Sequence, residues 1–72
     1  MNATQTAELT EAQFLEVLRN ACNEAGSQRA WAEKNNLAPS FLNDVLKGKR
    51  GVTDRILDAL GYEFVGFYRK KD

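Results

Sequence analysis

One stretch, residues 28–47, constrains the fold of this chain more than any other. It reads QRAWAEKNNLAPSFLNDVLK, and its residue types predict two short helices joined by a tight turn. Asn36 suits the turn because asparagine tolerates a positive φ better than most residues. Pro39 fits the first turn of the following helix, where its missing N–H is not needed. The sequence therefore predicts helices at about residues 28–35 and 39–47.

Capping residues and apolar spacing predict two further helices, one on each side of this pair. Thr10 and Gln13 form the pattern of a capping box, so the first helix is expected to start at Thr10. Gly26 ends that helix by supplying a left-handed conformation. Thr53 is expected to cap the last helix, which runs to about Leu60. The side chains expected to face inward are Phe14, Leu15, Leu18, Ala21, Cys22, Ala25, Trp31, Ala32, Leu42, Val45, Leu46, Ile56, Leu57 and Leu60.

The C-terminal segment has the composition of a strand. Residues 62–68 read YEFVGFY, which is rich in aromatic and β-branched residues and too short for a helix. We expect one strand with Phe64 and Tyr68 on one face and Val65 and Phe67 on the other. No second strand is evident in the sequence, and an isolated strand leaves its backbone groups unpaired. These four residues are therefore expected to pair with the same strand of a second copy, forming a homodimer.

The predicted fold class is mainly α, with four short helices followed by one C-terminal β-strand. The second and third helices form a helix-turn-helix. Residues 1–9 are polar and lack apolar periodicity, so we expect a flexible N-terminal arm. Residues 10–72 are expected to form a single domain, because a chain of 72 residues has room for only one.

Composition argues against several classes of protein and site. With Cys22 as the only cysteine and no histidine, the chain can form no intrachain disulfide and lacks the usual zinc ligands. The apolar runs are far shorter than the roughly 20 residues that span a bilayer, and no signal peptide is recognisable. Paired carboxylates, a phosphate-binding glycine loop and a nucleophile beside a base are also absent from the sequence. We expect an intracellular protein that is not an enzyme and needs no cofactor, metal, membrane or small-molecule substrate.

The formal net charge is zero, but the charges are segregated along the chain. Residues 1–26 carry four glutamates against Arg19, a net charge of −3. Residues 27–72 carry nine Lys or Arg against six Asp or Glu, a net charge of +3. The positive charge therefore accompanies the predicted helix pair, as expected for a surface that meets nucleic acid.

The helix pair and the residues after it resemble the helix-turn-helix family of phage repressor and Cro-type regulators, also called the XRE family. The matching residues are Gln28, Ala32, Leu37, Leu42, Val45 and Gly48, followed by the basic segment 46–50 and by residues 56–61. The chain departs from the family pattern at Asn35, at Asn36, where glycine is usual, and at Leu46, where an acidic residue is frequent. The resemblance implies a dimeric, cytoplasmic transcriptional regulator of phage or prophage origin that binds a double-stranded DNA operator.

In that family the start of the second helix of the pair enters the major groove. The resemblance therefore assigns base reading to Pro39, Ser40, Phe41, Asn43 and Asp44. Ser40 can donate or accept a hydrogen bond at a base edge, and Asn43 can make two hydrogen bonds to adenine.

Two of these residues have a second interpretation. Asp44 either accepts a hydrogen bond from a cytosine amine or pairs with a nearby basic residue such as Lys47. Phe41 either meets a thymine methyl group or packs against Trp31 or the segment that follows the helix.

Five residues are predicted to contact DNA phosphates: Gln28, Arg29, Lys47, Lys49 and Arg50. The basic residues after the helix could instead be an ordinary solvated charge cluster that complements the helix dipole. The alternative function is an antitoxin-like or adaptor protein that uses the same fold to bind another protein. Zero net charge and Asp44 on the reading helix favour that alternative.

Overall fold

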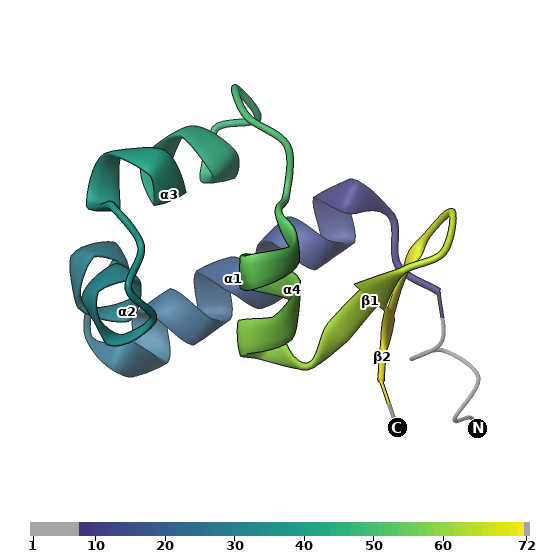
Figure 1. The fold of residues 1–72 in the computed structure, drawn as a ribbon, viewed down its shortest axis with the longest axis horizontal. Coiled ribbons are helices and arrows are strands. Elements are labelled where there is room, and N and C mark those ends of the chain that lie inside the picture. The colour runs from purple at the N-terminus through teal and green to yellow at the C-terminus, as the bar shows by residue number, and fades with distance from the viewer. Residues whose placement is uncertain (1–7, 72) are drawn as a thin grey trace.

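A computed structural model describes residues 8–71 of the chain. It consists of four helices followed by a β-hairpin (Figure 1). The elements are α1 (Glu11–Ala25), α2 (Gln28–Lys34), α3 (Pro39–Leu46), α4 (Asp54–Leu60), β1 (Tyr62–Phe64) and β2 (Tyr68–Lys70). The predicted fold class, mainly helical with a C-terminal β element, is confirmed.

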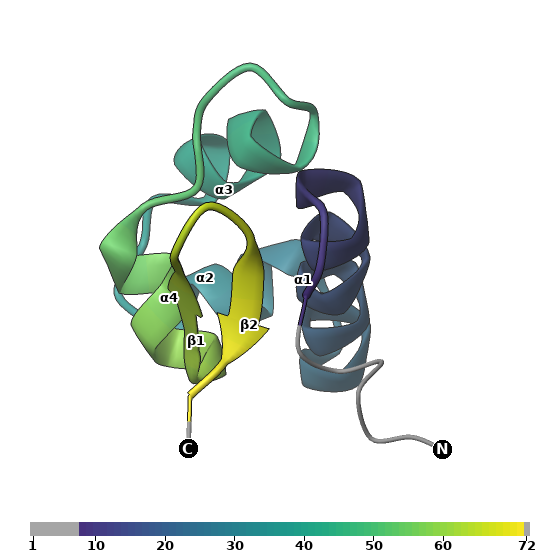
Figure 2. The ribbon, with the colours of Figure 1, turned by 90° about the vertical axis from the view of Figure 1, so that its right-hand side faces the viewer.

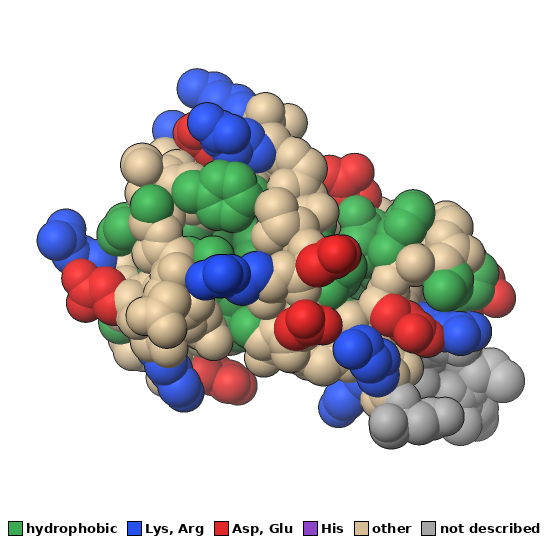
Figure 3. All heavy atoms as spheres, in the orientation of Figure 1, with side chains coloured by type: hydrophobic (Ala, Val, Ile, Leu, Met, Phe, Trp, Pro, Cys, Tyr) green, Lys and Arg blue, Asp and Glu red, His purple; other side chains and the backbone are tan. Residues whose placement is uncertain are grey.

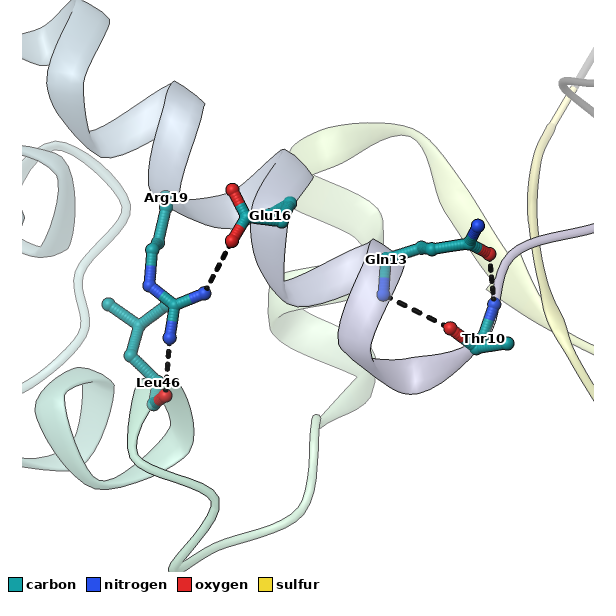
Figure 4. Close-up of polar contacts among 5 residues, drawn as sticks. All are labelled: Thr10, Gln13, Glu16, Arg19 and Leu46. Atoms are coloured by element: carbon teal, nitrogen blue, oxygen red, sulfur yellow. Dashed lines mark hydrogen bonds and ion pairs between the residues drawn. The ribbon is translucent and has the colours of Figure 1, made fainter.

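Capping residues fix both ends of α1 and the start of α2, and the sequence indicated those of α1. Thr10 Oγ1 accepts a hydrogen bond from the Gln13 N–H at 3.2 Å, and Gln13 Oε1 accepts one from the Thr10 N–H at 2.9 Å (Figure 4). Gly26 ends α1 with φ at 106°. Ser27 Oγ accepts a hydrogen bond from the Ala30 N–H at 3.0 Å and so caps α2. Both predicted helix starts are therefore correct.

The turn between α2 and α3 is stabilised by backbone hydrogen bonds. Asn36 has φ at 59°, in the left-handed region, as its residue type predicted. The Leu37 N–H donates to the Ala32 carbonyl at 2.8 Å, and Arg55 of α4 donates to the Asn36 carbonyl at 3.3 Å. Thr53 occupies the N-cap position of α4, but its side chain makes no capping hydrogen bond, so that part of the prediction was wrong.

All four helices contribute to one core. Its buried side chains are Phe14, Leu18, Cys22, Trp31, Ala32, Leu42, Val45, Leu46, Ile56 and Leu57. Each of these was predicted to face inward, and the other predicted inward residues pack against the core while partly exposed. Burial raises the pKa of the Cys22 thiol, which behaves as a small apolar side chain.

The C-terminal segment is a hairpin, which corrects the prediction of one strand over residues 62–68. Gly66, with φ at 92°, reverses the chain, and the Val65 N–H then donates to the Phe67 carbonyl at 2.9 Å. β1 and β2 pair antiparallel, with the register Tyr62 to Lys70, Glu63 to Arg69 and Phe64 to Tyr68. The turn was missed because Gly66 was read as an interior strand residue. Phe64 and Tyr68 do share a face, but as cross-strand neighbours.

The segment before α1 runs beside β2 (Figure 2), where Leu9 adds a third segment to the small sheet through an isolated antiparallel β-bridge to Tyr68. Its N–H donates to the Tyr68 carbonyl at 2.7 Å, and its carbonyl accepts from the Tyr68 N–H at 3.0 Å. The last residue of the predicted arm therefore lies against the hairpin, while residues 1–7 lie outside the described residues. Because the aromatic segment finds its backbone partners within the chain, the argument that it needs a second copy for pairing no longer holds.

Two tyrosines of the hairpin close the core at one end. The ring of Tyr68 stacks on Phe14 with centroids 4.7 Å apart, and the ring of Tyr62 meets Phe14 edge-on at 5.4 Å. Burial raises the pKa of Tyr68, and the Glu11 carboxylate raises it further. Both effects disfavour the phenolate form of Tyr68, which suits the contact of its ring with an apolar ring.

Replacing Phe14 should destabilise the whole domain. Phe14→Ala is expected to lower the free energy of unfolding by about 3–5 kcal/mol, because it empties a fully buried site and removes both ring contacts. Phe64 is the matched control, since 56% of it is exposed and Phe64→Ala should cost about 1 kcal/mol or less. Urea unfolding followed by circular dichroism measures both, and similar losses in the two variants would contradict the assignment of Phe14 to the core.

Candidate nucleic-acid interface

The outer face of α3 is polar. Ser40, Asp44 and Lys47 follow one another at helical spacing and lie on the side of the helix opposite its buried residues Leu42, Val45 and Leu46. Pro39 and Ser40 are exposed at the start of the helix, whereas the side chains of Asn43 and Asp44 are half-buried. Of the five predicted base-reading residues, Ser40 is thus the polar one that solvent reaches most openly.

Phe41 and Asp44 of α3 and Arg50 of the loop after it form a cluster, called here the Arg50 cluster. Arg50 Nε donates to Asp44 Oδ2 at 3.4 Å, and the guanidinium carbon lies 5.6 Å from the centre of the Phe41 ring. The backbone N–H groups of Lys49 and Arg50 donate to the Asp44 carbonyl at 2.8 and 3.4 Å. Gly48, with φ at 80°, allows the chain to fold back in this way.

The Arg50 cluster bears on both alternatives that the sequence left open. Asp44 pairs with a basic residue, but the partner is Arg50 and not Lys47. Phe41 is half-buried, packs against the core and lies beneath Arg50, which is the packing interpretation. Arg50 was predicted as a phosphate contact, and the structure places its guanidinium beside a carboxylate that offsets its charge.

A polar hollow of about 390 Å³ lies where α1, the start of α2 and α3 meet. It is lined by Arg19, Cys22, Asn23, Gln28, Asn43, Leu46 and Lys47. The hollow brings two predicted phosphate contacts, Gln28 and Lys47, next to the predicted base reader Asn43. Sequence reasoning missed Arg19 and Asn23. The one available signal was that Arg19 is the only basic residue in the acidic first third of the chain.

Arg19 connects α1 to the end of α3 (Figure 4). Its Nη2 donates to the Leu46 carbonyl at 3.1 Å, and its Nη1 lies 3.2 Å from Glu16 Oε2. The last carbonyls of a helix lack partners within that helix and carry partial negative charge, so a guanidinium stabilises them. Arg19 thereby helps to hold the C-terminal end of α3 in place against α1.

The remaining predicted phosphate contacts are exposed. Arg29 lies on α2 and pairs with Glu33 on the next turn at 3.2 Å. Lys47 and Lys49 form no ion pair with any residue in the range 8–71. Figure 3 shows Lys and Arg side chains gathered along the upper edge of the molecule, over the end of α3 and the loop that follows it. This edge is the most basic part of that view.

The hairpin lies at the other end of the molecule from α3 (Figure 1). Phe64 and Val65 at its tip are 56% and 46% exposed, whereas Phe67 and Tyr68 are half-buried. A second hollow of about 430 Å³ lies beside the tip, lined by Glu8, Leu9, Thr10, Glu11, Phe64, Gly66, Phe67 and Tyr68. Of the four predicted dimer residues, two are therefore available at the surface of one copy.

Comparison with known proteins does not place the chain in a family: no protein-family model, no curated protein and no solved structure matches it. In the described part of the chain, no helix is both long enough and apolar enough to cross a membrane. Within the same residues, no group of three or more His, Cys, Asp or Glu side chains is arranged to hold a metal ion. The case for a function therefore depends on the geometry of α2, α3 and the loop after them.

The contact between Arg19 and α3 can be tested by stability. Arg19→Ala is expected to lower the free energy of unfolding by about 1 kcal/mol, because the Leu46 carbonyl loses a charged donor at a half-exposed position. Glu16→Gln is the control, since it removes only the exposed ion pair and should cost about 0.5 kcal/mol or less. If urea unfolding gives the same small loss for both, Arg19 does not stabilise the end of α3.

Proposed function

We propose that this protein is a sequence-specific DNA-binding transcriptional regulator of the Cro or repressor type, of phage or prophage origin, that reads operator half-sites in the major groove. The observation that carries the proposal is the pairing of α2 and α3, with a polar outer face on α3 and a basic loop at its end. A helix with its side chains is about 10–12 Å across, which matches a major groove about 12 Å wide.

The proposed base contacts come from Ser40 and Asn43. Ser40 is exposed on the first turn of α3, and Asn43 lies one turn further on, at the rim of the polar hollow. Lys47 and Lys49 flank this surface as positive charges with no ion pair among residues 8–71, which suits DNA phosphates. Gln28 and Arg29 are the proposed phosphate contacts from α2.

The function can be tested by selecting bound duplexes from a random library and measuring the Kd for the consensus. We expect a consensus with two related half-sites about one helical turn apart. The double variant Ser40→Ala/Asn43→Ala should weaken binding to that consensus by about tenfold or more, while its binding to unrelated duplex stays within about twofold. Lys49→Ala is the control and should weaken both to the same degree.

One result would contradict the assigned base contacts, and another would contradict the function itself. Equal losses on consensus and unrelated duplex for Ser40→Ala/Asn43→Ala would remove these residues as readers. If no sequence is enriched even at low salt, and the protein instead recovers one protein partner in stoichiometric amount, the antitoxin-like or adaptor alternative is favoured.

A homodimer is part of the proposal. One copy has few base contacts to offer, because Pro39 has no N–H donor and Asp44 is paired with Arg50. Two copies on two half-sites double the number of contacts. Phe64 and Val65 are the large apolar side chains exposed at the hairpin tip, so we propose this tip as the surface that meets the second copy.

The dimer can be tested by sedimentation over a range of protein concentrations. Wild-type protein should approach twice the mass of one chain as concentration rises, and Val65→Asp should shift this transition to higher concentration by at least about tenfold, because it puts a charge in an apolar contact. Asn20→Asp adds the same charge at an exposed position of α1 and should have no effect. A wild-type protein that stays monomeric both free and on a two-half-site duplex would contradict the dimer.

A further inference from the structure

The Arg50 cluster holds its guanidinium on two sides. Phe41 supports one side through its ring, and Asp44 engages the Nε–H. Hydrogen bonds from the backbone N–H groups of Lys49 and Arg50 to the Asp44 carbonyl fix the loop that carries Arg50. These contacts restrict the orientation of the Arg50 side chain before any ligand binds. The side chain lies beside the outer face of α3, which is the face proposed to enter the major groove.

The nitrogen atom of Arg50 that contacts Asp44 decides which of its other donors remain free to bind a ligand. Its Nε makes the contact with Asp44, while Nη1 and Nη2 have no hydrogen-bond partner among residues 8–71. The side chain of Arg50 is 59% exposed and that of Asp44 is 35% exposed, so solvent or a ligand can reach the pair. Arg50 thus presents N–H donors of a planar group whose orientation is already restricted.

A phosphate is a poor match for this pair. Asp44 offsets the charge of Arg50, so the pair as a whole adds little attraction to a DNA backbone, and the carboxylate itself is repelled by phosphates. A base edge carries no net charge, so binding to it depends on how well the hydrogen-bond donors are placed. Guanine is the base that presents two acceptors, O6 and N7, to the major groove, and arginine is the side chain that commonly pairs with both.

We infer that Arg50 is a specificity-determining residue that reads a guanine in each half-site, and that Asp44 and Phe41 position it. This inference rests on the proposed function, because it requires α3 to lie in the major groove. It replaces the assignment of Arg50 as a phosphate contact. It also gives Asp44 a role on a surface that faces DNA: the carboxylate restrains the arginine that reads the base.

The test uses the full chain and the duplex consensus selected above, together with duplexes in which each base pair of a half-site is replaced in turn. When the one G·C pair that Arg50 reads is replaced, the affinity of the wild-type protein for the duplex should fall by roughly 5- to 150-fold. The Arg50→Ala variant should bind the consensus more weakly by a similar factor. Its affinity should no longer depend on which base pair stands at that position. Arg50→Lys keeps the charge but not the planar donors or the ring contact, so it should restore only a small part of the loss.

Asp44→Ala separates positioning from a general structural role. Removing this carboxylate should raise affinity for unrelated duplex, because Arg50 is no longer offset, while lowering the preference for guanine at the same base pair. In the Arg50→Ala background, Asp44→Ala should no longer change that preference. Thermal unfolding of each variant checks that the domain is folded under the binding conditions. A folded Asp44→Ala variant with unchanged preference would overturn its positioning role.

Lys49→Ala is the matched control from the same loop. It should weaken binding to every duplex equally and reduce the salt dependence by about one phosphate contact, with the base preference unchanged. If Arg50→Ala behaves in this way, Arg50 is a phosphate contact and the inference fails while the proposed function stands. If the wild-type protein enriches no duplex at all, the proposed function fails and the inference fails with it.

Discussion

The fold depends on one face of α1, where Phe14, Leu18 and Cys22 recur at four-residue intervals and are almost completely buried. Phe14 receives both hairpin tyrosines, and Arg19, one residue after Leu18, reaches the end of α3. A single helix thus supports the hairpin at one end and the helix pair at the other. Because the chain has only 72 residues, the hairpin and the helix pair are each too small to form a core alone. By packing on the same helix, α1, they contribute to one core.

The helices could be predicted because their determinants are local. Thr10 and Gln13 are three residues apart, and Gly26, Asn36 and Pro39 each act through their own backbone preferences. The hairpin could not be predicted in the same way. Its turn depends on one glycine inside an aromatic run, and its third segment pairs residues far apart in the sequence. Local patterns contain no information on such long-range pairing.

In the candidate site, too, the features set by local sequence could be predicted, and those set by contacts between separate parts of the chain could not. The exposure of Ser40 and the burial of Leu42 and Val45 on the other side of α3 follow from helical periodicity, and the sequence indicated both. The partner of Asp44 did not follow, because helical spacing points to Lys47, whereas a left-handed Gly48 turns the chain and brings Arg50 instead. Arg19 was missed for a related reason: its contact with α3 spans 27 residues and depends on how two helices pack.

The bridge between Leu9 and Tyr68 has a consequence for the order in which the chain can fold. The turn between α2 and α3 closes short loops, which cost little conformational entropy and form quickly. The bridge joins two segments near opposite ends of the described chain and closes the longest of its loops. During synthesis the helix pair can therefore form before residues 62–70 exist, whereas the sheet and the packing of the two tyrosines on Phe14 are completed only after those residues have been made.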